Sequence, residues 1–161
     1  MRSLKTLGAL LVWSAALLAA PLHAQEAFDA CELFTQPDAE ASLGTAAAPE
    51  PVNPKAKRPK VVPLCTYSGF REGKAVEARA QFRFARSDAE AQRAFDEHRM
   101  QVQTKPIIIA GADATFWSAK TGQMNMRKGR TWVTLSVGPQ KLSERDMDQA
   151  KKLADLLVKK L

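Results

Sequence analysis

The stretch AVEARAQFRFA (residues 75–85) decides the fold, because apolar and polar side chains alternate along it without a break. Its apolar residues are Val76, Ala78, Ala80, Phe82 and Phe84, and the polar residues between them are Glu77, Arg79, Gln81 and Arg83. This period of two predicts a β-strand with one face buried and the other in solvent. The stretch TWVTLSV (residues 131–137) alternates in the same way. Both stretches therefore predict strands of a sheet that covers a core with one face.

Three helices are expected around these strands. Thr35 precedes a short helix that Gly44 ends. Ser87, with Glu90 three residues later, has the signature of a capping box and predicts a second helix. Ser143 is the expected cap of a last helix, in which apolar residues recur at helical spacing and lysines lie opposite.

Shorter strands are expected over residues 64–70, after Gly111, and between Gly122 and Gly129. The order of elements is then helix, two strands, helix, three strands, helix, with tight turns such as REGK (residues 71–74) between neighbouring strands. Apolar helix stripes must cover one face of such a sheet. The sequence therefore predicts a two-layer α+β domain, with a mostly antiparallel sheet of about five strands and helices packed on one face.

Residues 1–24 have the three-part layout of a secretory signal peptide. Arg2 and Lys5 precede the uncharged run LGALLVWSAALLAA, and the segment ends in PLHA at Ala24. This apolar run is too short and wrongly flanked for a membrane span. We expect cleavage after Ala24, no integral membrane span afterwards, and one domain over residues 25–161 in the periplasm or outside the cell. Loss of Arg2 and Lys5 lowers the formal net charge from +7 to +5, which favours anionic partners.

Two cysteines, Cys31 and Cys65, are expected to form a disulfide in that oxidising compartment. Their spacing excludes a Cys-x-x-Cys redox motif, and one histidine outside the signal segment excludes a metal-ligand set. The alternative of a lipid on Cys31 is disfavoured, since charged residues separate it from the apolar run. Between the cysteines lies AAAPEPVNPKAKRPK (residues 46–60), a Pro/Lys-rich stretch that predicts a surface loop.

The sequence carries no recognisable catalytic motif. It contains neither a Gly-x-Ser-x-Gly elbow nor a glycine-rich phosphate loop, so no cofactor is expected. His98 falls on the apolar stripe of its helix and is expected to be a core or boundary residue. Asp113, in a glycine-flanked turn, is expected to bond its own backbone. These observations disfavour an enzyme, although a hydrolase of unrecognised type stays open.

The outer face of the sheet suggests a binding surface. If Val133 and its alternating neighbours point into the core, Trp132 must point outward, and the same argument turns Arg79, Arg83 and Arg127 outward. Aromatic and arginine side chains together are enriched at protein interfaces. We expect these four residues to contact an anionic envelope component or an envelope protein. The alternative is that the proline-rich loop or another segment covers the tryptophan.

Several short motifs resemble a family of small exported bacterial domains of unknown function, best known from actinobacterial lipoproteins. The motifs are DACELFTQPDAEASLG (residues 29–44), CTYSGF (65–70) and GADATFW (111–117). The resemblance implies an α+β fold and paired cysteines, and it carries no catalytic residues. This chain lacks the lipidation cysteine of those lipoproteins, so membrane tethering is not implied.

Composition, compartment and motifs together predict an exported, non-catalytic binding or accessory domain of the bacterial cell envelope. Nucleic acid is not expected as a partner there. The alternatives are a secreted or periplasmic hydrolase-like enzyme and an inhibitor of a secreted enzyme.

Overall fold

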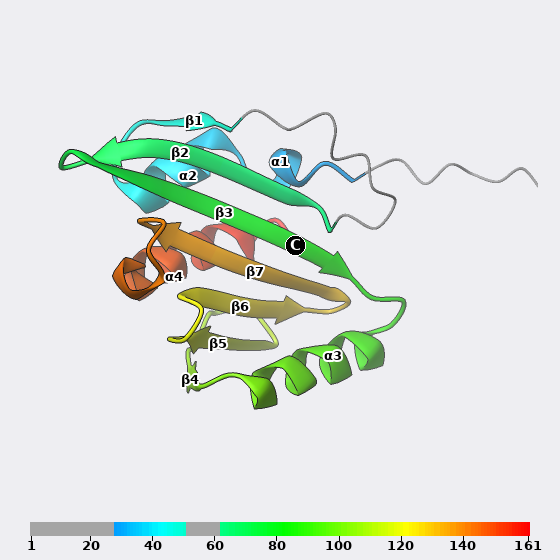
Figure 1. Cartoon of the computed structure of the whole chain (residues 1–161). Helices are drawn as coiled ribbons and strands as arrows, with labels where there is room; N and C mark the ends of the chain where they lie inside the picture. Colours follow the sequence, from blue (N-terminus) through cyan, green and yellow to red (C-terminus); the bar gives the residue numbers. More distant parts are fainter. Residues whose placement is uncertain (1–27, 51–61) are drawn as a thin grey trace, which may run out of the picture.

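The protein forms an antiparallel sheet of seven strands with helices packed against it, in a computed structural model that describes residues 28–50 and 62–161 (Figure 1). The strands are β1 (Ala47–Pro49), β2 (Leu64–Arg71), β3 (Lys74–Phe84), β4 (Thr104–Pro106), β5 (Ala114–Ser118), β6 (Gln123–Lys128) and β7 (Thr131–Gly138). The helices are α1 (Ala30–Leu33), α2 (Gln36–Leu43), α3 (Asp88–Gln101) and α4 (Met147–Leu157), with a 3-10 turn, η1 (Leu142–Glu144). The order across the sheet is β1-β2-β3-β7-β6-β5-β4. The predicted α+β class with an antiparallel sheet is confirmed.

The two alternating stretches of the sequence form β3 and β7, which pair in the middle of the sheet. Their register places Ala80 beside Leu135 and Phe82 beside Val133. All four side chains are 0% exposed, so the apolar positions of both strands share one buried face. We call this the inner face, and the opposite side of the sheet the outer face.

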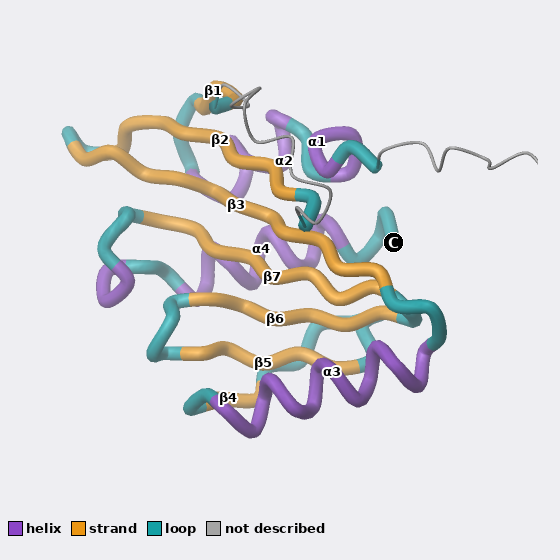
Figure 2. The backbone as a smooth tube through the Cα atoms, turned by 45° about the vertical axis from the view of Figure 1, so that its right-hand side comes forward, coloured by secondary structure: helices purple, strands orange, loops and turns teal. Residues whose placement is uncertain are grey.

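Helices cover both faces, but unequally (Figure 2). α2 and α4 pack on the inner face, where Leu43, Leu153 and Leu157 join the main core. α3 packs on the outer face beside β6 and β7, where Phe95 joins a second, smaller cluster. The expectation that the helices lie on one face therefore holds for α2 and α4 and not for α3.

The two edge strands, β1 and β4, were not predicted. Each has three residues and no apolar alternation, and each ends in a proline, Pro49 or Pro106. Proline lacks a backbone N–H and is tolerated at sheet edges. β1 pairs with β2, so residues 47–49 belong to the sheet and not to the loop expected over residues 46–60. The rest of that loop from residue 51 onward, and the expected signal peptide, lie outside the described residues.

The helix starts follow the sequence signals in two of three cases. Thr35 and Asp38 form the capping box of α2, and the side chain of Ser87 accepts the Glu90 N–H at the start of α3. α4 begins three residues later than expected, because Asp146 and not Ser143 accepts the first free N–H groups of the helix. Among the described residues, no helix is both long and apolar enough to cross a membrane.

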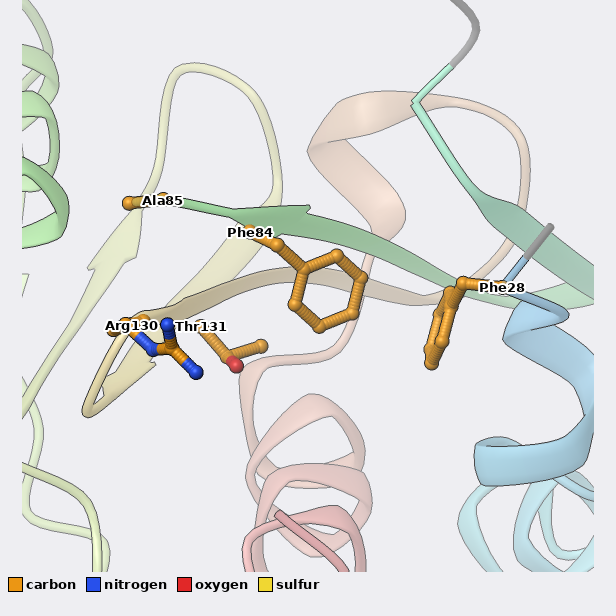
Figure 3. Close-up of a pocket in the computed structure, with 5 residues that line it drawn as sticks. All are labelled: Phe28, Phe84, Ala85, Arg130 and Thr131. Carbon is orange, nitrogen blue, oxygen red and sulfur yellow. The ribbon is translucent and has the colours of Figure 1, made fainter. Parts of the chain in front are cut away.

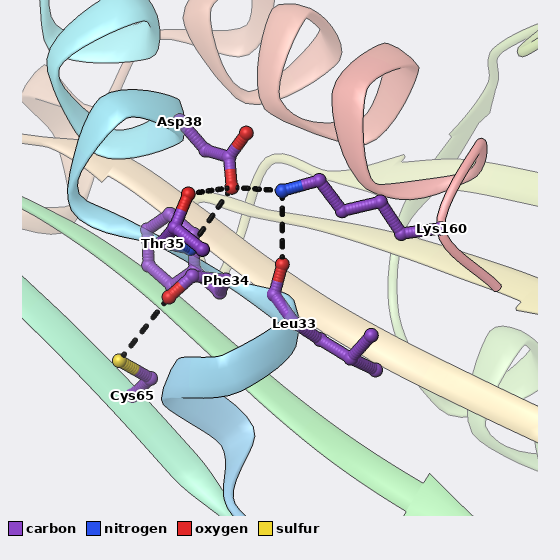
Figure 4. Close-up of polar contacts among 6 residues, drawn as sticks. All are labelled: Leu33, Phe34, Thr35, Asp38, Cys65 and Lys160. Atoms are coloured by element: carbon purple, nitrogen blue, oxygen red, sulfur yellow. Dashed lines mark hydrogen bonds and ion pairs between the residues drawn. The ribbon is translucent and has the colours of Figure 1, made fainter.

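A disulfide and an ion pair hold α1 and α2 to the rest of the domain. Cys31 and Cys65 are bonded, as predicted, which ties α1 to β2. Near the C-terminus, Lys160 Nζ lies 2.5 Å from Asp38 Oδ2 and donates to the Leu33 carbonyl at 3.2 Å (Figure 4). The same carboxylate oxygen accepts the N–H and the hydroxyl of Thr35 at 2.9 and 2.7 Å. The Cys65 sulfur drawn beside the Phe34 carbonyl carries no hydrogen in a disulfide, so that contact is not a hydrogen bond.

This network predicts a loss of stability in acid. Burial raises the pKa of Asp38, but the hydrogen bonds from Lys160 and Thr35 and the lysine charge together lower it below its ordinary value of 3.8. A carboxyl group with a lower pKa in the folded state stabilises the fold above the unfolded pKa, and the contribution is lost as pH falls through the folded pKa. We therefore expect stability to fall below pH 3.8, and Asp38→Asn to remove that part of the pH dependence.

Urea unfolding at pH 7 and at decreasing pH checks this expectation, with Glu97→Gln on the exposed surface of α3 as the control. At pH 7, Lys160→Met is expected to cost about 1–2 kcal/mol, a modest value since the lysine is partly in solvent. If the stability of wild type and of Asp38→Asn fell equally with pH, the network would not be the cause of the loss of stability in acid.

Candidate anion-binding pocket on the outer sheet face

The outer face of the sheet has two parts. Over β6 and β7, α3 covers an aromatic cluster of Phe95, Phe116 and Trp132. Over β2 and β3, no helix of the described residues packs against this face, and Leu64 and Phe70 are 50% and 73% exposed. The four residues of the expected binding surface divide between these two parts.

Trp132 lies on the outer face, as predicted, but the expectation that it is exposed is wrong. Its side chain is only 6% exposed. α3 brings the rings of Phe95 and His98 to 5.8 and 5.1 Å from the indole, centroid to centroid. The indole Nε1–H donates to Asn125 Oδ1 at 3.1 Å, which satisfies its one polar group. Trp132 is therefore a core residue of the second cluster and is not available to a partner.

Arg83 and Arg127 flank Trp132 in the register of the sheet, on β3 and β6 respectively. The Arg83 guanidinium lies 4.4 Å from the centre of the indole ring, in cation–π geometry. Arg127 Nη1 lies 3.0 Å from Asp113 Oδ2 and 3.3 Å from the Gly129 carbonyl oxygen. Asp113 was expected to bond the backbone of its own turn, but its carboxylate accepts the Gly129 N–H and so anchors the β6–β7 turn. Both arginines therefore have structural partners.

Arg79 is the one predicted residue that faces an open pocket. A hollow of about 140 Å³ lies on the outer face, over the middle of β3 and β7 and the first residues of β2 and β6, and Arg79 shares it with Arg145 from the segment that follows η1. The other lining residues are Leu64, Gln81, Gln123, Thr134 and Ser136. Two guanidinium groups therefore share a small site whose remaining polar groups are uncharged amides and hydroxyls.

Arg79 has one carboxylate partner. Its Nη2 lies 2.9 Å from Glu77 Oε2, and the Glu77 side chain is only 7% exposed. The other carboxylate oxygen of Glu77 accepts the side-chain N–H of Gln140 at 2.6 Å. Arg79 Nε is buried and has no hydrogen-bond partner among the described residues. One donor of this arginine thus lacks an acceptor, which is uncommon for a buried polar atom.

Arg145 is held in place by two close backbone approaches. Gly122 has φ +58°, and a Cβ there would lie 2.7 Å from the Leu142 carbonyl oxygen and 2.8 Å from Arg145 Cδ. Gly138 has φ +117°, and its Cβ would lie 3.3 Å from Arg145 Cα. Only glycine accommodates both the positive φ and these contacts. Arg145 Nη1 donates to the Thr121 carbonyl at 3.2 Å, which fixes one end of the guanidinium beside the pocket that Arg145 lines.

The charge of the pocket is not balanced. Within the described part of the chain, Arg145 has no ion-pair partner, while Glu77 is paired with Arg79. Burial lowers the pKa of Arg145 and the nearby Arg79 lowers it further, against a smaller opposing effect of Glu77. The guanidinium nevertheless stays protonated, since arginine does not lose its proton in proteins. The site therefore carries about one uncompensated positive charge.

These groups suit binding better than proton transfer. Guanidinium groups donate charge-assisted hydrogen bonds to anions, while amides and hydroxyls orient neutral polar groups. Glu77, the carboxylate that pairs with Arg79 at the pocket, is already engaged by Arg79 and Gln140. His98 lies outside the pocket, against Trp132 and Phe116, where burial and the Arg83 charge lower its pKa. The described residues contain no group of three His, Cys, Asp or Glu side chains placed to hold a metal ion.

A larger hollow of about 360 Å³ lies where β3 ends and β7 begins (Figure 3). Phe28 and Phe84 meet edge to face there, with ring centres 4.6 Å apart, and Arg130 and Thr131 complete the lining. It holds one cationic side chain and no convergent set of polar groups. Phe28 is also the first described residue of the chain, so what precedes it at this rim is outside the structure. The smaller pocket is the stronger candidate, because its polar groups converge.

Sequence reasoning missed Arg145. With Ser143 taken as the helix cap, Arg145 falls in the first exposed turn of a helix, whereas the observed 3-10 turn holds it short of α4. Gly122 is expected from the sequence only to bound a strand, and nothing in its spacing from Gly138 indicates that both approach one arginine. Comparison of the chain with protein-family models, with curated proteins and with solved structures gives no match. The resemblance drawn from short motifs therefore stays a prediction.

Proposed function

We propose that the protein is an exported, non-catalytic binding domain of the bacterial cell envelope, which holds an anionic group of its partner between Arg79 and Arg145. Three features support the proposal. The first 24 residues have the layout of an export signal, and a disulfide joins Cys31 and Cys65, as suits an oxidising compartment. The third feature is the pocket itself.

The convergence of two arginines on a small open pocket with one engaged carboxylate is the observation that carries the proposal. An isolated guanidinium on a surface needs no ligand, because water solvates it. Here the Arg145 guanidinium is partly buried, and Arg79 Nε has lost contact with water without gaining an acceptor. The Arg79 side chain as a whole is 39% exposed, so an anion in the pocket would accept charge-assisted hydrogen bonds from the accessible N–H groups of both arginines and offset their mutual repulsion.

Arg145→Gln is expected to weaken this binding at least about tenfold, since a hydrogen bond to a charged group contributes about 1.5–3 kcal/mol. The test is retention of material from a bacterial envelope extract on immobilised protein, measured for wild type and variant at several salt concentrations. Arg93→Gln is the matched control, because Arg93 is an exposed arginine on α3, away from the pocket.

Two further observations complete the test. Melting curves must show that Arg145→Gln is folded. Arg145→Lys should restore part of the binding, because lysine keeps the positive charge but lacks the planar guanidinium that donates two parallel hydrogen bonds. If Arg145→Gln retains as much material as wild type, or if Arg93→Gln loses as much, the pocket is not the binding site.

A further inference from the structure

We infer that the group bound in this pocket is a singly charged acidic sugar, that is, one negative charge on a hydroxyl-rich ring, as in a uronic acid. The inference rests on the proposed function and specifies its ligand. It follows from three properties of the pocket: its net charge, the direction of its hydrogen-bond donors and acceptors, and its size.

The net charge favours a monoanion. Glu77 neutralises one of the two arginines at 2.9 Å, which leaves about one positive charge for the ligand. A carboxylate matches that charge. A phosphate monoester carries close to two negative charges at pH 7 and would be repelled by the Glu77 carboxylate. Glu77 therefore acts against a dianion, while it holds Arg79 in place for a monoanion.

The hydrogen-bond pattern favours a ligand that donates as well as accepts. Trp132 Nε1–H can only donate, so the oxygen it contacts at 3.1 Å is the carbonyl oxygen of the Asn125 amide. The Thr134 hydroxyl lies 3.1 Å from the same oxygen, which has no hydrogen, so the Thr134 hydrogen is committed to Asn125. The Thr134 oxygen therefore offers only lone pairs to the pocket. A simple anion cannot donate to it, whereas a sugar hydroxyl can.

The other neutral lining groups fit the same chemistry. Gln81 and Gln123 each present an amide donor and an amide acceptor, and Ser136 presents a hydroxyl. Hydroxyl groups of a sugar both donate and accept, so they can pair with all of them. At about 140 Å³ the pocket is smaller than the ~300–1,000 Å³ typical of sites for whole small molecules. It fits one ring or part of one, such as a residue at the end or side of a polymer.

Three sugars that differ only at C6 test the inference: glucuronate, glucose and glucose 6-phosphate, each titrated into the full exported protein at pH 7. We expect glucuronate to bind at least about tenfold more tightly than glucose, and more tightly than glucose 6-phosphate. Glu77→Gln should raise the affinity for glucose 6-phosphate at least about fivefold, because it removes the opposing charge. Tighter binding of glucose 6-phosphate than of glucuronate to wild type would overturn the inference.

A second variant keeps the test independent of the buried Glu77. Thr134→Val removes the acceptor and should weaken glucuronate about threefold to tenfold, with no change for acetate, which has the carboxylate but no hydroxyl groups. Acetate or a peptide with a free C-terminal carboxylate that binds as tightly as glucuronate would overturn the sugar assignment. Such a result would still support the proposed function if Arg145→Gln abolished it. If Arg145→Gln bound every probe as well as wild type does, the result would instead count against the proposed function itself.

Discussion

Trp132→Ala is expected to lower the free energy of unfolding by about 3–5 kcal/mol, the range for a large aromatic side chain removed from a core. The indole is 6% exposed and meets Phe95 and His98 of α3 on one side. Its N–H bond to Asn125 would be lost as well, which leaves a buried amide oxygen with one partner fewer. The substitution therefore removes both the contact surface and the polar anchor beneath α3.

Urea unfolding measures this loss, and Phe70→Ala is the matched control. Phe70 is also an aromatic residue of the outer sheet face, but it is 73% exposed. Its replacement should change stability by no more than about 0.5 kcal/mol. Phe95→Ala should cost a similar amount to Trp132→Ala, and the double variant less than the sum, because the two rings share one contact. A loss below about 1 kcal/mol for Trp132→Ala would mean that α3 does not cover the tryptophan.

Removal of the disulfide is expected to cost about 2–5 kcal/mol, and about 3.8 kcal/mol in the chain-entropy model for a separation of 34 residues. The bond restricts the unfolded chain between Cys31 and Cys65. In the folded state it also fixes α1 and, directly after it, Phe34, which is fully buried and meets Tyr67 edge to face. The double variant Cys31→Ala/Cys65→Ala should show the full loss.

Chemical unfolding with and without a reducing agent checks this expectation. Reduction should destabilise wild type by the same amount as the double substitution, and it should leave the double variant unchanged. Titration of two free thiols in folded, non-reduced protein would contradict the bond.

The sequence alone identifies what depends on local pattern. The alternation in residues 75–85 and 131–137 assigned each side chain to a face, and the sheet places every one of them as assigned, including Trp132 and the arginines. The starts of α2 and α3 were predicted because each is closed by a side chain that accepts a backbone N–H only three residues away, from Thr35 to Asp38 in α2 and from Glu90 to Ser87 in α3. Such signals do not depend on distant parts of the chain.

What could not be predicted depends on tertiary packing. No local pattern states which face a helix covers, so the apolar stripe of residues 88–101 was placed with the others on the inner face. Phe116 and Trp132 on the outer face were a clue, since two buried aromatic residues need a cover. The pocket was hidden for the same reason: Gly122 and Gly138 lie against the segment of Arg145, and these close approaches form only when the turns and strands around them pack together.

The central claim is that an anion binds between Arg79 and Arg145, and a chemical-shift map tests it most directly. Amide signals of the ¹⁵N-labelled protein would be followed during titration with glucuronate at constant ionic strength. We predict the largest shifts at Gln81, Gln123, Thr134, Ser136 and Arg145, and their loss in Arg145→Gln. Shifts confined to the lysine-bearing surface of α4, or spread evenly over all basic residues, would contradict a specific anion site on the outer face of the sheet.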